Sequence, residues 1–288
     1  MTPTPSPSTP TATALLFDGQ KSYIALTQPL PAMPAGVTIE FWALGAGDLP
    51  RDTCVFSSCR ADGARVLNIH LPWSDSTIYW DAGDGAAYDR IHKAAQAGEF
   101  KGSWTHWAFV KDVARGEMAI YRDGALWNDA SGQSRPITES QMAHIGAYVD
   151  GNYKWSGRLA EFRIWNRPRT AEEIRADRGR RLTGQEPGLV SYWPLDRIDA
   201  NGTTPDLTGH RPGAVQGATT VRDDALTAAL PAAGAGQRPL VLTPGAPEHV
   251  VSWAKMTSGI EDYARWQQMF EGRSGKDAPP FRRGRIWA

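Results

Sequence analysis

The sequence is poor in cysteine: Cys54 and Cys59 are the only two among its 288 residues. Small secreted domains that depend on disulfides contain many more cysteines, so a disulfide scaffold is not indicated. Two thiols also cannot complete the four-ligand shell of a structural zinc ion. Residues an odd number of positions apart on one strand point to opposite faces, so a bridge would need a turn between them. We therefore expect two free, buried thiols, with a disulfide as the alternative.

The sequence also lacks an excess of charge and a long apolar run. Lys and Arg number 31, as do Asp and Glu; nucleic-acid partners usually require a basic field, so we expect no nucleic acid. No stretch approaches the roughly 20 apolar residues of a transmembrane helix. The Pro/Thr/Ser-rich segment 1–13 has no apolar core of a secretory signal. We expect a cytoplasmic chain as translated, or export without a signal peptide, which would allow an extracellular role.

Short strands between Gly, Asp and Pro turns dominate residues 15–165. Val37, Ile39 and Phe41, for example, alternate with polar residues, and Arg122–Gly124 places Asp-Gly at the centre of a turn. This texture is typical of antiparallel sheets. Strands and helices do not alternate, which argues against a parallel α/β fold. The pattern predicts an all-β sandwich or barrel.

One helix is signalled after these strands. Thr170–Glu173 has the spacing of a capping box, with Thr170 as the N-cap and Glu173 three residues on. Gly184 supplies a stop, and basic residues near Arg181 suit the negative end of a helix dipole. We predict a short helix from Thr170 to about Arg181.

The C-terminal segment combines aromatic and basic residues. Ser258–Glu261 is a second capping box, and near-helical spacing of aromatic residues predicts a short helix that ends near Gly272. We expect this tail to dock on the same domain or on another subunit, forming an oligomer or assembly; a solvated tail is the alternative. The candidate docking residues are Tyr263, Trp266, Phe270, Phe281, Arg282, Arg283, Arg285 and Trp287.

Ten segments in chain order carry a family resemblance. They resemble the laminin G-like, concanavalin A-like jelly-roll modules that are common in large bacterial surface and secreted proteins. The resemblance implies a two-sheet antiparallel jelly-roll sandwich with one short helix, before the C-terminal helical tail. The segments are Leu16–Gly19, Tyr23–Leu26, Val37–Trp42, Ile78–Gly83, Tyr88–Ile91, Trp104–Val110, Ile120–Gly124, His144–Gly146, Trp155–Asn166 and Arg169–Ile174.

Residues 188–220 also resemble family sequence, but in many members a similar stretch precedes the motif found here at Leu16–Gly19. This stretch either closes the sandwich from the C-terminal side or begins a truncated second repeat. We favour closure, because a truncated repeat would leave Tyr192, Trp193 and Leu195 exposed. The expected organisation is a disordered lead-in over 1–14, a jelly roll over 15–226, a linker over 227–238 and the tail over 239–288.

Catalytic constellations are missing from the sequence. Related jelly-roll enzymes such as β-glucanases carry paired carboxylates about 5 Å apart, but the pattern Glu-x-Asp-x-x-Glu is absent. Glu172 and Glu173 fit helix capping, while Glu40 and Glu161 are isolated acids on predicted strands. No nucleophile elbow surrounds a serine, and we interpret His106 as a packed core residue. We therefore expect no enzyme activity.

The resemblance implies a single Ca²⁺ in many members, held by acidic side chains and loop carbonyls. Asp18 and Glu161 match best, although Ala160 stands where a common family pattern has Asp. Asp18 would otherwise stabilise its own turn. Calcium is the one cofactor that we consider, and no organic cofactor is expected.

Three segments are candidates for ligand contacts. Jelly-roll lectins bind sugars through loops and a concave face, with sugar C–H groups on aromatic rings. Residues 147–155 and 72–75 combine aromatic and polar side chains, and 84–89 is similar; for each, the alternative is a turn with one ring folded over the core edge. The candidate ligand-binding residues are Trp73, Asp75, Tyr148, Asp150, Asn152, Tyr153 and Trp155.

These observations favour a non-enzymatic, lectin-like recognition or adhesion module that binds carbohydrate and has a partner-docking tail. The main alternative is a structural or decorating subunit of a fibre or particle that binds no sugar. A glycoside hydrolase is the third and weakest hypothesis. The expected partner is a glycan or another protein subunit.

Overall fold

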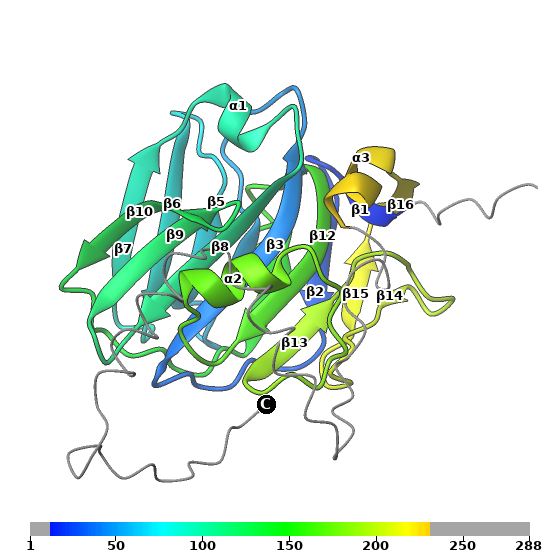
Figure 1. Ribbon diagram of the computed structural model, residues 1–288. Coiled ribbons are helices and arrows are strands. Elements are labelled where there is room, and N and C mark those ends of the chain that lie inside the picture. The colour runs from blue at the N-terminus through cyan, green and yellow to red at the C-terminus, as the bar shows by residue number, and fades with distance from the viewer. Residues whose placement is uncertain (1–11, 231–288) are drawn as a thin grey trace, which may run out of the picture. The chain divides into compact units, whose positions relative to one another are not determined.

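The computed structural model describes residues 12–230. Two antiparallel eight-stranded sheets pack face to face, with short helices at the edges and over one face (Figure 1). This confirms the predicted all-β sandwich. None of the helices within residues 12–230 combines the length and apolar character needed to cross a membrane. The predicted tail helix and the tail's docking residues lie outside the described residues.

Sheet A and sheet B are named here by their strand order. Sheet A runs β10 (Ala125–Ser131), β9 (Glu117–Arg122), β8 (Thr105–Asp112), β3 (Gly36–Gly45), β12 (Ser156–Trp165), β1 (Thr13–Asp18) and β16 (Thr219–Arg222), with β13 (Leu189–Trp193) also paired to β12. Sheet B runs β14 (Thr203–Thr204), β15 (Gly213–Gln216), β2 (Tyr23–Leu26), β11 (Met142–Ile145), β4 (Phe56–Cys59), β5 (Arg65–His70), β6 (Thr77–Gly83) and β7 (Tyr88–Ala94). The helices are α1 (Ala97–Phe100), α2 (Ala171–Asp177) and α3 (Asp224–Ala229).

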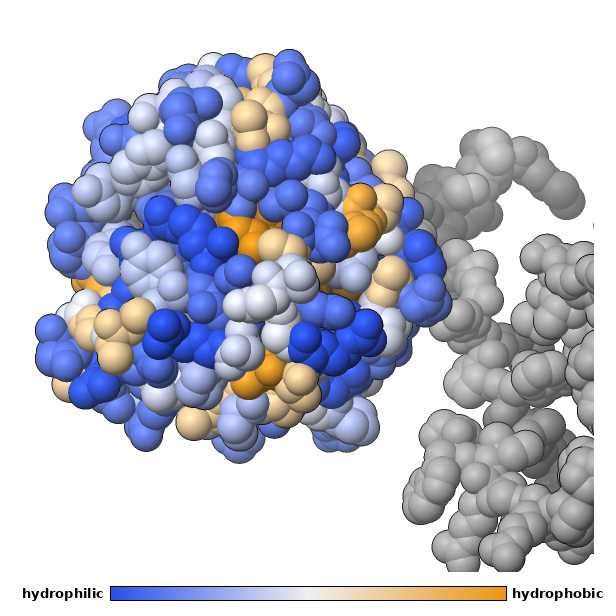
Figure 2. Space-filling model, turned by 90° about the vertical axis from the view of Figure 1, so that its left-hand side faces the viewer, coloured by the Kyte–Doolittle hydropathy of each residue, from blue (hydrophilic) through white to orange (hydrophobic). Residues whose placement is uncertain are grey.

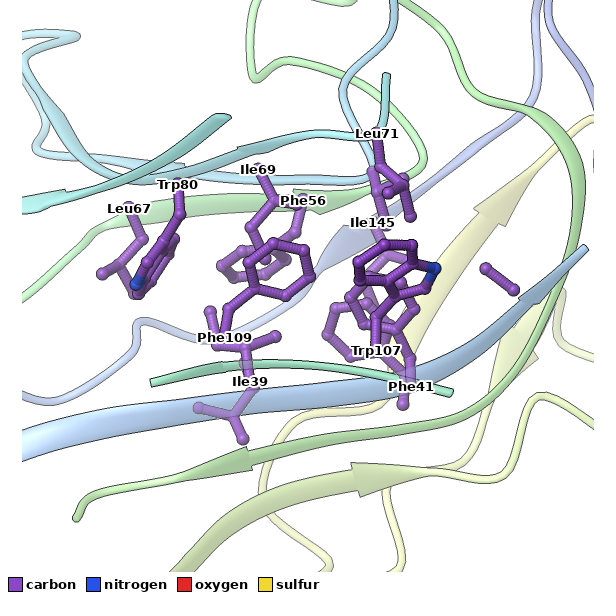
Figure 3. Close-up of a cluster of buried hydrophobic side chains, with 14 of the residues drawn as sticks. Ile39, Phe41, Phe56, Leu67, Ile69, Leu71, Trp80, Trp107, Phe109 and Ile145 are labelled. Carbon is purple, nitrogen blue, oxygen red and sulfur yellow. The ribbon is translucent and has the colours of Figure 1, made fainter. Parts of the chain in front are cut away.

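The core lies between the two sheets and follows from the alternation of apolar residues along the strands. Ile69 and Trp80 of sheet B point toward Ile39, Phe41 and Phe109 of sheet A (Figure 3). All five are fully buried. Because one face of each strand is committed to this core, the other face is free to carry polar and aromatic side chains.

Cys54 and Cys59 are both free and buried, as predicted. Burial raises the pKa of each thiol above its usual value. Neither therefore has the thiolate character of a reactive cysteine.

Residues 188–220 close the sandwich. β13 adds to β12, β15 pairs with β2, and β16 pairs with β1, so this segment completes both sheets. Tyr192 and Trp193 are fully buried as a result. The closure interpretation is therefore correct, and this stretch is not the start of a second repeat.

The boundary expected at 227 needs correction. α3 continues to Ala229, and Leu226 and Leu230 pack in a buried cluster with Ala14 and Trp42. Asp223 caps this helix, because its side chain accepts a hydrogen bond from the Leu226 N–H. These residues are part of the sandwich and not of a linker.

α2 has the predicted capping box, with Thr170 and Glu173 each bonded to the other's backbone N–H. The helix ends at Asp177, earlier than predicted, and the basic residues that follow it form ion pairs. Arg180 Nη2 lies 2.6 Å from Asp177 Oδ1, and Arg181 binds Asp196.

Candidate functional site

The outer face of sheet B, which points away from sheet A, carries a row of aromatic rings across three strands. Trp80 of β6 points into the core, so its neighbours Tyr79 and Asp81 point outward. His70 of β5 and His92 of β7 flank Tyr79 directly in the strand register. The Tyr79 and His92 rings stack with centroids 5.4 Å apart.

Two loops add rings to this row. The ring centroids of Trp73 and Tyr153 lie 5.0 Å apart, and those of Trp73 and His70 lie 4.4 Å apart. The ring centroids of Tyr148 and Tyr153 lie 6.3 Å apart. The segments 72–75 and 147–155, which the sequence marked separately, therefore meet over the same sheet.

The loop that presents Tyr148 and Tyr153 is closed by its own backbone. The N–H of Trp155 donates to the Gly146 carbonyl at 2.9 Å, and that of Tyr148 donates to the Asn152 carbonyl at 3.0 Å. Tyr153 has a φ of 52°, a conformation that costs energy for a bulky residue. The surrounding hydrogen bonds hold its ring over the sheet despite this strain.

An ion cluster occupies the centre of the same face. Both oxygens of Asp81 are bound: Arg65 Nη1 lies 2.6 Å from Oδ2, and Arg90 Nε lies 2.6 Å from Oδ1. The Asp81 side chain is fully buried, while those of Arg65 and Arg90 are 23% and 35% exposed. The two guanidinium groups also lie about 5 Å from the ring centroid of Tyr88, in cation–π contact.

These side chains form one continuous surface. Tyr88 and Tyr153 are 40% and 42% exposed, so their ring surfaces are accessible to a ligand. We define the aromatic face as His70, Trp73, Tyr79, Tyr88, His92, Tyr148 and Tyr153 together with Arg65, Asp81 and Arg90.

The predicted polar contacts lie at the border of the aromatic face. Asp75 accepts hydrogen bonds from the Thr77 N–H at 2.8 Å and from the Tyr79 hydroxyl at 3.2 Å. Asp150 and Asn152 are exposed at the loop tip, where the Asn152 N–H donates to Asp150 Oδ1 at 2.8 Å. Their first role is to shape the turns that carry Trp73 and Tyr153.

Trp155 needs correction as a predicted ligand contact. Its side chain is fully buried in the core between the sheets and cannot meet a ligand from solvent. The loop turns inward at this residue to begin β12 at Ser156.

Several residues of the face were missed by the sequence analysis. Tyr79 and Asp81 alternate with apolar neighbours on β6, which indicates a strand with two different faces. That alternation does not reveal that Arg65 and Arg90 come from the two flanking strands to bind Asp81. The register of the sheet brings the three together.

Asp18 and Glu161 do not fit one calcium site. Asp18 Oδ1 accepts hydrogen bonds from three successive backbone N–H groups, Gln20 to Ser22, as a turn residue does. Burial acts to raise the pKa of Asp18, but these bonds and the Ser22 side chain lower it below its usual value. Asp18 pairs with Ser156 on β12, and Glu161 lies five positions further along that strand, with four residues between.

Glu161 is surrounded by arginines and the Tyr192 hydroxyl, which donates to its Oε2 at 2.5 Å. Its Oε2 accepts from Arg163 Nη2 at 3.0 Å, and its Oε1 lies 3.4 Å from Arg181 Nε. Ca²⁺ needs six to eight oxygen ligands. Within residues 12–230, no group of three or more His, Cys, Asp and Glu side chains is arranged to hold a metal.

The outer face of sheet A carries a second, buried charge cluster. Arg169 Nη1 donates to Glu40 Oε1 at 2.8 Å, and Arg163 contacts both Glu40 and Glu161. α2 lies over this sheet and packs Ile174 against β8 (Figure 1). Glu40 and Glu161 are the two isolated strand acids noted in the sequence. Both are buried and paired with arginines. His106 is also buried, and burial lowers its pKa well below the usual value, as expected for a packed histidine.

The side of the molecule where β7 and β10 lie is mostly hydrophilic. Figure 2 shows only small, separate hydrophobic patches on this side. Leu126 of β10, which is 56% exposed, is an isolated apolar residue. A large protein interface usually needs a wider apolar patch.

The fold and the aromatic face together define a lectin-like β-sandwich. A family model described as the concanavalin A-like lectin/glucanases superfamily matches residues 18–175, more than half of the chain. The chain belongs to this superfamily, which confirms the resemblance to laminin G-like modules.

Solved structures with similar folds include a protein from Bacteroides ovatus described as a proposed carbohydrate-binding protein, with 20% identity and a TM-score of 0.57. The similarity covers 74% of this chain and 60% of that one. A heptameric SAP-like pentraxin from Limulus polyphemus matches with 18% identity over 57% of this chain and 80% of its own, with a TM-score of 0.47. The binding domain of botulinum neurotoxin serotype G matches with 16% identity over 57% and 41%, with a TM-score of 0.44. No match is found among curated protein sequences.

Proposed function

We propose that this protein is a carbohydrate-binding module that binds glycan on the aromatic face and does not turn it over. The observation that carries this proposal is the set of partly exposed rings on the outer face of sheet B, among them Tyr88 and Tyr153. Sugar rings present flat C–H surfaces that pack on aromatic rings, while their hydroxyl groups need nearby polar partners. Both kinds of group are present here.

The polar groups of the face are positioned before a ligand arrives. Asp81 fixes both guanidinium groups, and Asp75 accepts a hydrogen bond from the Tyr79 hydroxyl. Side chains that are already held in place lose less conformational entropy on binding. The likeness in fold to the Bacteroides ovatus protein, described as a proposed carbohydrate-binding protein, supports the same function.

The acids of the face argue for binding without hydrolysis. Hydrolysis of a glycosidic bond usually needs two carboxyl groups that flank it, one of them able to donate a proton. Asp81 is fully buried and bound at both oxygens by arginines. Asp75 lies six residues away along the same chain segment, at the edge of the face, and is engaged by Thr77 and Tyr79.

A glycan array probed with the full chain tests the proposal. We expect binding to at least one polysaccharide class, with no release of reducing sugar and no loss in EDTA, because the candidate calcium residues do not share a site. Trp73→Ala and Tyr153→Ala should each weaken binding at least about tenfold, since buried aromatic contacts are common hot spots. Leu126→Ala, an exposed apolar residue on sheet A, is the matched control and should leave binding unchanged. Absence of binding to every glycan, or equal binding by all three variants, would overturn the proposal.

A further inference from the structure

Among residues 12–230, the centre of the aromatic face offers hydrogen-bond donors and one acid, Asp81, which is not accessible. The two oxygens of Asp81 receive Arg65 Nη1 at 2.6 Å and Arg90 Nε and Nη2 at 2.6 and 2.8 Å. Its side chain is fully buried. Two arginines against one aspartate leave one positive charge at this point.

Most N–H groups of the two arginines are not used by Asp81. A guanidinium group has five N–H donors, and Asp81 receives one from Arg65 and two from Arg90. Both side chains are partly exposed, 23% for Arg65 and 35% for Arg90, so a ligand can reach them from solvent. Tyr88 contacts both guanidinium groups through its ring and keeps them beside an accessible stacking surface.

This combination selects a particular chemistry. A sugar hydroxyl is both donor and acceptor, whereas a carboxylate or sulfate accepts only and carries the charge that the two arginines leave uncompensated. We propose that the aromatic face recognises glycans with an anionic substituent, a uronate or a sulfate, which Arg65 and Arg90 bind while the sugar ring lies on the aromatic side chains. This inference rests on the proposed function and names its ligand class.

The other charges nearby restrict where the anionic group can lie. Asp75 and Asp150 are exposed at loop positions on the border of the face, and their oxygens are engaged by backbone N–H groups of the turns. They repel an anion at the border and are screened by salt because they are exposed. The anionic group of the glycan is therefore most favourably placed at the centre of the face, beside Arg65 and Arg90.

Two matched ligand pairs test the inference by calorimetric titration of the full chain. The first is polygalacturonate against its carboxyl-reduced form, and the second is dextran sulfate against dextran; they distinguish a uronate from a sulfate. We expect one acidic ligand to bind at least tenfold more tightly than its neutral partner, with a preference that shrinks as salt is raised. Equal or tighter binding of both neutral partners would overturn this inference while leaving the proposed function intact. No binding to these ligands or to any glycan on the array would overturn both.

Variants separate specific recognition from general charge. Arg65→Gln should remove the tenfold preference, because the charge that Asp81 leaves uncompensated is lost while Arg90 still holds both oxygens of Asp81. Arg65→Lys, which keeps the charge but not the forked geometry, should restore part of the preference. Arg115→Gln is the matched control, since Arg115 is 70% exposed in the turn between β8 and β9. An unchanged preference in Arg65→Gln, or an equal loss in Arg115→Gln, would contradict the inference.

Discussion

At the scale of residues, Tyr153 and Trp155 belong to one loop but have different environments. Tyr153 is 42% exposed on the aromatic face, whereas Trp155 is fully buried between the sheets. The two rings are separated by Lys154 alone. The same loop thus contributes both to the aromatic face and to the core.

Trp155→Ala should lower the free energy of unfolding by about 3–5 kcal/mol, the usual cost of removing a buried Trp or Phe side chain. Tyr153→Ala should lower it far less, because much of its ring faces solvent. Urea denaturation of both variants measures the difference. Equal loss of stability would mean that Tyr153 is a core residue and not part of a binding surface.

His70 connects stability to pH. Burial lowers its pKa to about 4; the nearby charges Arg65 and Arg90 act in the same direction, while Asp81 and the hydrogen bond with Thr53 O oppose it. In the unfolded chain the pKa returns to about 6.5. The unfolded state therefore takes up this proton first as pH falls, so stability is complete above pH 6.5 and is lost from there down to about pH 4.

The depressed pKa predicts a loss of roughly 3 kcal/mol of stability over this pH window from His70. His70→Asn keeps an N–H for the Thr53 carbonyl but does not titrate, so it should lose less stability across the same range. Urea denaturation from pH 7 to pH 4 makes the comparison. The same pH dependence in both proteins would show that His70 is not responsible.

At the scale of elements, α2 is attached to sheet A by buried ion pairs. Arg169 contacts Glu40 at 2.8 Å, also binds Asp177, and lies 4.1 Å from the Trp165 ring centroid. Its side chain is 2% exposed. Such contacts orient the helix without forming a site that is open to a ligand.

Arg169→Ala should lower the free energy of unfolding by about 3–5 kcal/mol, because it leaves the buried Glu40 carboxylate without its best partner. Arg175→Ala on the same helix should cost less than about 1 kcal/mol, since the Arg175–Glu172 pair is exposed. Thermal unfolding of the two variants compares them. Glycan binding should be unchanged in both, and its loss in Arg169→Ala at a temperature where the protein is folded would contradict the placement of the site on sheet B.

The elements that could be predicted from sequence are those with local signals. The capping box at Thr170 and the alternation in Val37–Trp42 depend on neighbouring residues only. The aromatic face could not be predicted in full, because Arg65, Asp81 and Arg90 meet only through the register of three strands. Residue composition alone also does not show which ring of a loop turns inward. The prediction of Trp155 as a ligand contact is wrong for this reason.

At the scale of the whole molecule, the sandwich depends on its C-terminal strands. β13 pairs with β12 along Phe162–Trp165, and β16 covers the edge of β1. Removal of these strands would expose Phe162 and the rest of this edge. The tail beyond residue 230 lies outside the described residues.

Two truncated chains distinguish the role of the C-terminal strands from that of the tail. A chain of residues 1–237 should fold and bind glycan as the full chain does, whereas a chain of residues 1–187 should not fold, because it lacks β13 to β16. Circular dichroism and glycan binding provide the measurement. If the tail docks on a partner, the chain of residues 1–237 should lose an oligomer or partner while glycan binding stays intact. Folding of the chain of residues 1–187 would contradict the need for residues 188–220 to complete the two sheets.

A crystal structure of the full chain with the glycan that binds it most tightly would locate the binding site directly. We expect sugar rings over Tyr153, Tyr88 and Tyr79 on the outer face of sheet B, with polar substituents at Arg65 and Arg90. A glycan bound to sheet A, or at loops away from sheet B, would contradict this expectation.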